Sequence, residues 1–141
     1  MTIRSKSDAE TREIGFKMGK KLAKGTSVLL CLYGELGTGK TTFIRGLAKG
    51  LGITSRITSP TFTYQRVHLG KPKLYHFDCY RLSKPDELLL HDVHEALGNC
   101  DGVVAIEWSE KIRHHLQEKH TDIYFEYVDE NTREIKIKKA A

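Results

Sequence analysis

The stretch "GELGTGKTT", residues Gly34 to Thr42, decides the fold that the sequence predicts. Its spacing of glycine, four residues, glycine, lysine and threonine is the pattern of a phosphate-binding loop that joins a strand to a helix. The apolar run "SVLLCLY" (27–33) precedes it, and "TTFIRGLAKGLG" (41–52) follows it with apolar residues on one side. The sequence therefore predicts a buried strand, a glycine loop and an amphipathic helix in that order.

Each fixed position of this motif has a physical role toward a nucleoside triphosphate. Glycines let backbone N–H groups crowd around a phosphate, and the helix that begins near Lys40 adds its N-terminal donors and dipole. Lys40 would neutralise charge between the β- and γ-phosphates, and Thr41 would offer its hydroxyl to Mg²⁺. A glycine-rich turn without a ligand is the alternative, and the flanking strand and helix argue against it.

Helical segments are expected on both sides of the loop. The first element of the chain should be a helix that begins at Ser7, because Glu10 stands at the capping-box spacing, and Gly25 should end it. The stretch "KPDELLLHDVHEALG" (84–98) predicts one or two short helices, and "SEKIRHHLQ" (109–117) predicts another. Helices thus separate the expected strands along most of the chain.

Strands are expected after the glycine loop at 61–68, 74–78 and 103–108. The stretches "DIYFEYV" (122–128) and "REIKIK" (133–138) should pair across the turn "DENT". Because strands and helices interleave, the sequence predicts the α/β class. We expect a P-loop NTPase-like three-layer sandwich, with a mostly parallel sheet and a C-terminal antiparallel hairpin, in a single domain over residues 1–141.

Composition places the chain among ordinary globular proteins. It has 141 residues, of which 39% are hydrophobic and 29% charged, and no apolar run approaches the ~20 residues that a membrane span needs. The first residues lack an apolar signal core, so we expect a cytoplasmic protein. The net charge of +5 is compatible with an anionic partner, either a nucleotide or a nucleic acid.

Two carboxylates follow apolar strands and are candidates for the chemistry of the site. Glu107 ends "VVAIE" and Asp78 ends "LYHFD", which should bring both to the sheet edge that carries the loop. Glu107 is the stronger candidate for Mg²⁺, and Asp78 would orient the attacking water or hold Mg²⁺ through water. The alternatives are a surface glutamate at a strand end, and an aspartate that forms a turn or pairs with Arg81.

The segment "SPTFT" (59–63) follows the helix after the loop, where a segment that senses the γ-phosphate often lies. Thr61 and Thr63 are its candidate contacts. A turn that leads into the next strand is the alternative interpretation.

The sequence also narrows the class of P-loop protein. It contains no Asn-Lys pair of the kind that reads guanine, and it is too short for a transporter ATPase. A small P-loop kinase remains an alternative, although the arginines are scattered rather than clustered in a lid. An RNA-binding protein gated by ATP is a second alternative, which rests on the positive charge.

Four motifs in this order, "GELGTGKTT", "SPTFTY", "YHFDCYRL" and "IEWSEKI", resemble the TsaE (YjeE) family of bacterial P-loop ATPases over nearly the whole chain. The resemblance implies a part in making N6-threonylcarbamoyladenosine in tRNA. It implies a Mg²⁺-dependent, slow ATPase that cycles between ATP and ADP. It further implies that the partner is the TsaD–TsaB heterodimer and that tRNA is contacted only indirectly or weakly.

The family pattern also implies roles for individual residues. Mg²⁺ would lie on Thr41 and Glu107, and Asp78 would be essential for hydrolysis or switching. Lys40 and Thr61, the latter in the switch segment, complete the catalytic set. The phosphates would lie on Gly37, Thr38, Gly39, Lys40, Thr41 and Thr42.

The same resemblance implies further contacts with the nucleotide. Trp108 would lie close to it, although its position after Glu107 otherwise indicates core packing on the opposite face of the strand. Asp8, Thr11 and Arg133 would lie near the base and sugar.

Overall fold

The computed structural model describes residues 1–24, 28–35, 37–57, 65–80, 82, 87–99 and 102–139. Its strands are β1 (Thr2–Ser5), β2 (Val28–Tyr33), β3 (Gln65–His68), β4 (Lys73–Asp78), β5 (Gly102–Glu107), β6 (Thr121–Tyr127) and β7 (Arg133–Lys139). Its helices are α1 (Asp8–Leu22), α2 (Lys40–Gly50) and α3 (Glu87–Gly98), with the short 3₁₀ helices η1 (Ser109–Lys111) and η2 (Arg113–His115). No helix among these residues has the length and apolar character that crossing a membrane requires.

Within the described residues, seven strands form one mixed sheet of order β1-β7-β6-β2-β5-β4-β3. Strand β2 lies at its centre and runs parallel to both β5 and β6, and β4 runs parallel to β5. The pairs at the two margins, β3–β4, β6–β7 and β1–β7, are antiparallel. The predicted α/β class, with its parallel core and C-terminal antiparallel hairpin, is therefore confirmed.

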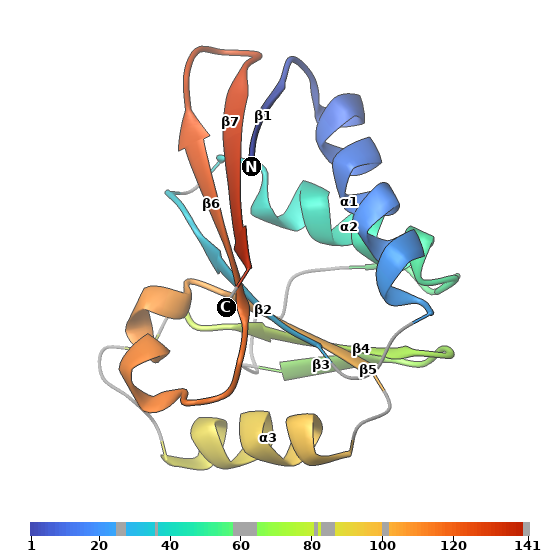
Figure 1. Ribbon diagram of the computed structural model, residues 1–141, viewed down its shortest axis with the longest axis vertical. Coiled ribbons are helices and arrows are strands. Elements are labelled where there is room, and N and C mark those ends of the chain that lie inside the picture. Colours follow the sequence, from blue (N-terminus) through green and yellow to red (C-terminus); the bar gives the residue numbers. More distant parts are fainter. Residues whose placement is uncertain are drawn as a thin grey trace.

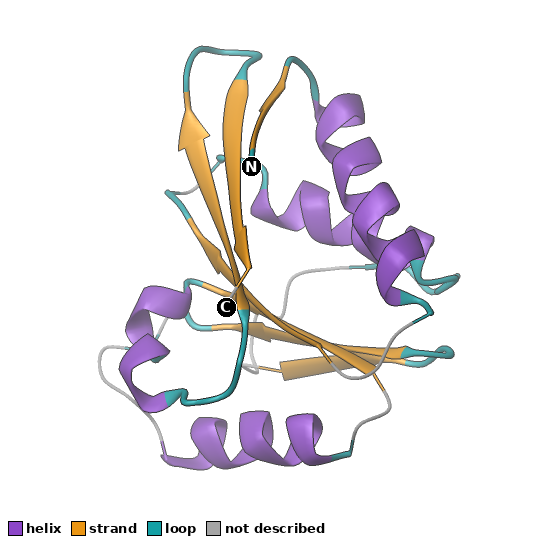
Figure 2. Ribbon diagram, in the orientation of Figure 1, coloured by secondary structure: helices purple, strands orange, loops and turns teal. Residues whose placement is uncertain are grey.

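Helices cover both faces of this sheet, which gives the expected three layers (Figure 1). Helices α1 and α2 lie together on one face, and α3 lies on the other with η1 and η2. The sheet is twisted, so that β6 and β7 run upright in the view of Figure 2 while β3 and β4 run across it.

The central strand explains why its sequence shows no alternation of polar and apolar residues. Leu30 and Leu32 of β2 belong to the apolar cluster under α1 and α2, whereas Leu29 and Cys31 belong to the cluster under α3. All four side chains are at most 2% exposed. A strand that is covered on both faces needs apolar residues at every position, as the run before the glycine loop predicts.

Helices α1 and α2 pack against each other through glycines. Gly15 and Gly19 lie on α1, and Gly46 and Gly50 lie on α2 with the same spacing of four residues. A side-chain carbon added at Gly46 would overlap the carbonyl oxygen of Arg12, and the other three positions are equally closed by backbone atoms. The two helix backbones therefore lie in direct contact. This contact fixes the position of α1 relative to α2 and to the glycine loop that precedes it.

The N-terminal segment differs from the prediction in one respect. The first element is strand β1, which pairs with β7, and not the helix. The helix that follows is capped as predicted, because the backbone N–H of Glu10 donates to the Ser7 hydroxyl at 3.1 Å. The helix extends to Leu22, and Gly25, its predicted end, lies outside the described residues.

Smaller differences affect other predicted elements. The stretch 109–117 forms two 3₁₀ turns rather than one short helix, and the stretch 84–98 contains one helix, α3. The strand expected at 103–108 spans 102–107, so that Trp108 lies just beyond its end. The strand expected at 61–68 is described only over 65–68.

Candidate functional site

A cavity of about 500 Å³ opens where the carboxyl ends of β4 and β5 meet the N-terminal ends of α1 and α2. Parallel strands that end together leave a crevice at this edge, which is the usual ligand site of open α/β sheets. The cavity is lined by Asp8, residues 37–42, Asp78, Tyr80, Glu107, Trp108 and Arg133.

The glycine loop takes a conformation that its glycines make accessible. Gly37 and Gly39 have φ angles of +78° and +100°, in the region that residues with a side chain rarely adopt. Gly39 precedes the first turn of α2, and its carbonyl oxygen accepts the N–H of Phe43 at 2.9 Å. The hydroxyl of Thr38 donates to the carbonyl oxygen of Glu35 at 2.7 Å and closes the loop on itself. The loop thus directs the N-terminal end of α2 at the cavity, where anions are favoured.

Lys40 reaches back across this loop. Its Nζ donates to the carbonyl oxygen of Gly34 and lies 3.6 Å from the centroid of the Trp108 ring. Burial lowers the pKa of this lysine, and nearby carboxylates, chiefly Glu107, oppose that effect. A cation that is 5% exposed on the cavity wall is placed to gain from an incoming phosphate.

Glu107 forms the centre of a buried polar cluster. Its Oε1 accepts the hydroxyl of Thr41 at 3.3 Å, and its Oε2 lies 2.6 Å from Nε2 of His76. Glu107 is 3% exposed and His76 is fully buried. A carboxylate and a hydroxyl on the wall of this cavity are the oxygen ligands that Mg²⁺ prefers, so the residues present fit that ion.

Asp78 lies directly beside Glu107, because the parallel register of β4 and β5 pairs these two residues. One oxygen of Asp78 accepts the backbone N–H of Tyr80 at 2.9 Å, which is the turn that the alternative interpretation expected. The carboxylate nevertheless lines the cavity. Burial raises the pKa of Asp78, and Glu107 raises it further. The Arg81 partner of the alternative ion pair lies outside the described residues.

Trp108 leaves the strand in a left-handed backbone conformation, with φ of +59°. This conformation is uncommon for a bulky residue and tends to occur at functional sites. The indole packs partly against the apolar cluster under α3, as its position after Glu107 predicts. Its ring also lies 4.9 Å from the ring of Tyr80 and lines the cavity.

The remaining predicted contacts fall into two groups. Asp8 and Arg133 line the cavity, and Nε of Arg133 donates to the carbonyl oxygen of Gly37 at 3.2 Å. Thr11 is 1% exposed and lies against Gly39, so it supports the loop from below and does not form part of the cavity wall. Thr61 lies outside the described residues.

Comparison with known proteins identifies the family. The model of the family described as "Threonylcarbamoyl adenosine biosynthesis protein TsaE" matches residues 5–135. The chain belongs to the TsaE family. The resemblance that the four sequence motifs indicated is thereby confirmed.

TsaE proteins from distant bacteria are similar over most of their length. The chain is 38% identical to the tRNA threonylcarbamoyladenosine biosynthesis protein TsaE of Treponema pallidum over 133 residues, which cover 94% of this chain and 96% of that protein. It is 40% identical to that of a Nostoc species over 131 residues, covering 90% and 78%. The crystal structure of Bacillus subtilis YdiB superposes with a TM-score of 0.79 and 29% identity, covering all of this chain and 86% of that one.

Two residues of the site were not predicted from the sequence: His76, which contacts Glu107, and Tyr80, which lines the cavity. Both lie in "YHFDCYRL", on either side of Asp78. His76 precedes Asp78 by two positions, so the alternation of a strand places both on the same face. That periodicity gives the face on which His76 lies, but its contact with Glu107 depends on the register of β4 beside β5. The ring contact of Tyr80 with Trp108 depends on the turn after the strand.

Proposed function

We propose that this chain is an ATP-binding, slowly hydrolysing subunit that tRNA N6-threonylcarbamoyladenosine modification requires, and that it acts on the TsaD–TsaB heterodimer. The observation that carries the proposal is the convergence of Lys40, Thr41, Asp78 and Glu107 on one cavity at the start of α2. Membership of the TsaE family supports the assignment to the tRNA pathway.

The loop geometry supports binding of a triphosphate. Backbone N–H groups at the start of α2 would surround the phosphates, and Lys40 would exchange the carbonyl of Gly34 for phosphate oxygens. Asp8 and Arg133 lie on the same wall, where the sugar and base would extend from the phosphates.

Thr41 and Glu107 would hold Mg²⁺, because they present a hydroxyl and a carboxylate that already lie 3.3 Å apart. When bound, the ion neutralises charge on the phosphate oxygens and helps to orient them. His76 keeps the second carboxylate oxygen of Glu107 occupied, which leaves Oε1 to face Thr41.

Hydrolysis would transfer the γ-phosphoryl group to water. The water oxygen attacks the γ-phosphorus, the bond from that phosphorus to the β–γ bridging oxygen breaks, and ADP and inorganic phosphate form. Asp78 would accept a hydrogen bond from the attacking water, and its raised pKa makes it a better base than an exposed aspartate. Lys40 would stabilise the charge that develops on the bridging oxygen.

The arrangement favours water over a metabolite as acceptor. Arg133 is the only arginine among the described residues that line the cavity. Its Nε donates to the carbonyl oxygen of Gly37, and its guanidinium carbon lies 4.8 Å from the centroid of the Tyr127 ring. It is therefore a fixed part of the wall, whereas kinases close a mobile lid over the transferring phosphate. This supports a switch that drives a partner rather than a kinase.

An assay of ATP turnover tests the proposal. Purified protein should release inorganic phosphate slowly alone and faster with TsaD–TsaB, and Lys40→Ala or Glu107→Ala should abolish release. Lys119→Ala, at an exposed position away from the cavity, serves as the control. Appearance of the phosphate on a small metabolite or nucleoside would replace the proposal with a kinase.

A further inference from the structure

A second cavity lies at the other end of α1, away from the nucleotide cavity. It has a volume of about 540 Å³ and lies between the C-terminal part of α1 and strands β1 and β7, with Leu30 of β2 and Thr121 of β6 also in its lining. Asp8, at the first turn of the same helix, lines the nucleotide cavity, so α1 spans the distance between the two. The two cavities share none of their lining residues.

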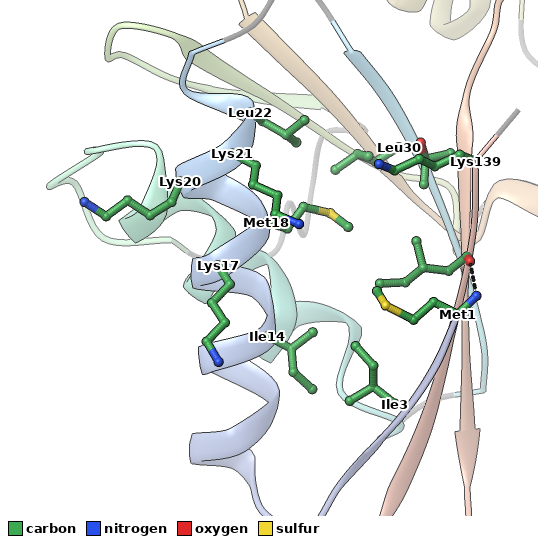
Figure 3. Close-up of a pocket in the computed structure, with 12 residues that line it drawn as sticks. Met1, Ile3, Ile14, Lys17, Met18, Lys20, Lys21, Leu22, Leu30 and Lys139 are labelled. Atoms are coloured by element: carbon green, nitrogen blue, oxygen red, sulfur yellow. Dashed lines mark hydrogen bonds between the residues drawn. The ribbon is translucent and has the colours of Figure 1, made fainter.

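The interior of this cleft is apolar. Figure 3 shows Ile14, Met18 and Leu22 of α1 pointing toward the strands, where Ile3 and Met1 face them. The three helix residues are only partly buried, although they pack on the core cluster beneath. Met1 is 77% exposed. Flexible methionine side chains on opposite walls suit a surface that adapts to a bound apolar group.

Every charged residue that lines the cleft is basic. Its charged lining residues are Lys17, Lys20, Lys21 and Lys139, and no acidic residue is among those that line it. In Figure 3 the ammonium groups of Lys21 and Lys139 extend toward the gap from opposite sides, whereas Lys17 and Lys20 extend outward from α1. A ligand with both apolar and acidic groups would therefore be complementary to the apolar interior of the cleft and to its lysines.

Strand β1 adds a feature that a polypeptide can use. Among the described strands it lies at the end of the sheet order, paired with β7 on one side, and it forms one boundary of the cleft. Edge strands offer backbone N–H and C=O groups to an extended segment of another chain. A fatty acid would fill the apolar floor and bind a lysine, but it would make no use of this edge.

We propose that the cleft between α1 and the β1–β7 edge is a docking site for a segment of a partner protein in which large apolar residues alternate with Asp or Glu. The apolar side chains enter between Met18 and Ile3, and the acidic ones pair with Lys21 and Lys139. This site goes beyond the proposed ATPase function and does not depend on it.

Selection of peptides on the full-length protein tests the proposal. A library of random peptides displayed on phage is selected on immobilised wild-type protein without nucleotide, and enriched peptides are synthesised with a fluorescent label. Binding is then measured by anisotropy to the wild type and to Lys21→Glu/Lys139→Glu. The matched control is Lys49→Glu/Lys119→Glu, which makes the same change of charge at exposed residues outside the cleft.

Enriched peptides should combine apolar with acidic residues. The cleft variant should weaken their binding at least about tenfold, because two charge-assisted contacts are reversed, and the control should change it less than about twofold. Failure to enrich peptides, enrichment of peptides without acidic residues, or equal binding by the cleft variant would overturn the proposal. If no peptide is enriched, and dodecanoate binds the wild type more tightly than Lys21→Glu/Lys139→Glu, the cleft is a lipid site and the peptide proposal is wrong. None of these measurements depends on ATP turnover. A negative result would therefore overturn the docking site without affecting the proposed ATPase function.

Discussion

Nε2 of His76 lies 2.6 Å from Oε2 of Glu107, and both side chains are buried. The carboxylate accepts, so the imidazole carries its proton on Nε2. The other ring nitrogen, Nδ1, is buried and has no hydrogen-bond partner among the described residues. The contact fixes the orientation of the carboxylate that is proposed to hold Mg²⁺, as second-layer partners commonly do for metal ligands.

Replacement of His76 tests this positioning role. His76→Ala leaves one oxygen of a buried carboxylate without its donor, so we expect a loss of about 1–3 kcal/mol in the free energy of unfolding. We also expect a higher Mg²⁺ concentration at half-maximal ATP turnover, while His76→Gln, which retains a donor, recovers part of both. Urea unfolding and Mg²⁺ titrations measure the two effects.

His68→Gln is the matched control for that experiment. His68 is also a buried histidine, its ring centroid lies 6.5 Å from that of His76, and it makes no contact with Glu107 that would orient the carboxylate. Its replacement should leave the Mg²⁺ dependence unchanged. An equal shift in both variants would show that general loss of packing, and not orientation of Glu107, is responsible.

Asp78 should limit stability at neutral pH. Burial raises its pKa in the folded state above the ordinary value of 3.8, so the folded protein binds this proton more tightly than the unfolded chain does. Between the two pKa values the unfolded state therefore carries fewer protons, and stability falls as pH rises through that window. Asp78→Asn removes the effect: its stability relative to wild type should increase from pH 3 to pH 7, while ATP turnover is lost. Chemical unfolding at a series of pH values checks this, and a pH-independent difference would contradict it.

Trp108 should report nucleotide binding directly. It is the single tryptophan of the chain, and the Lys40 ammonium lies 3.6 Å from its ring centroid. Because a phosphate would draw Lys40 away from the ring, ATP should change the intrinsic fluorescence in a saturable manner. Lys40→Met should abolish the change, and Tyr80→Leu, which alters the other ring contact, should alter the starting signal but keep the response. An unchanged fluorescence under conditions where ATP demonstrably binds would refute the movement of Lys40.

The glycine contact between α1 and α2 should be intolerant of a methyl group. A side-chain carbon at Gly46 would overlap the carbonyl oxygen of Arg12, and neither backbone can move without separating the helices. We expect Gly46→Ala to cost at least about 1–3 kcal/mol and to weaken ATP binding, because the glycine loop begins α2. Gly98→Ala is the control, since nothing lies within 4 Å of an added carbon there. Equal thermal stability of the two variants would show that the helices can separate without cost.

The central part of the fold could be predicted from the sequence because local and tertiary requirements coincide there. Strand β2 is apolar on both faces, the loop needs its glycines, and the Ser7 hydroxyl caps α1 by accepting the backbone N–H of Glu10. Strand β1 could not be found in this way. Its four residues, "TIRS", have no distinctive pattern, and the strand exists because β7 pairs with it.

The same distinction applies to the site. Lys40, Thr41 and Glu107 could be identified because the motif or a strand end marks each of them. His76 could not, since its role depends on the register that sets β4 beside β5 and brings its ring to the Glu107 carboxylate. The place of Thr11 could not be derived from its own stretch of sequence, because the packing of α1 on α2 sets its side chain against Gly39.

We propose that ATP turnover at this cavity sustains tRNA modification by TsaD–TsaB. The most direct measurement is reconstitution with tRNA, TsaD–TsaB, ATP and the remaining substrates, with threonylcarbamoyladenosine quantified per TsaD over many turnovers. With the wild-type protein the yield should continue to rise beyond one modification per TsaD, and with Lys40→Ala, or without the protein, it should stop near the first. An equal yield over many turnovers in the absence of this protein would show that its ATP turnover does not sustain the modification.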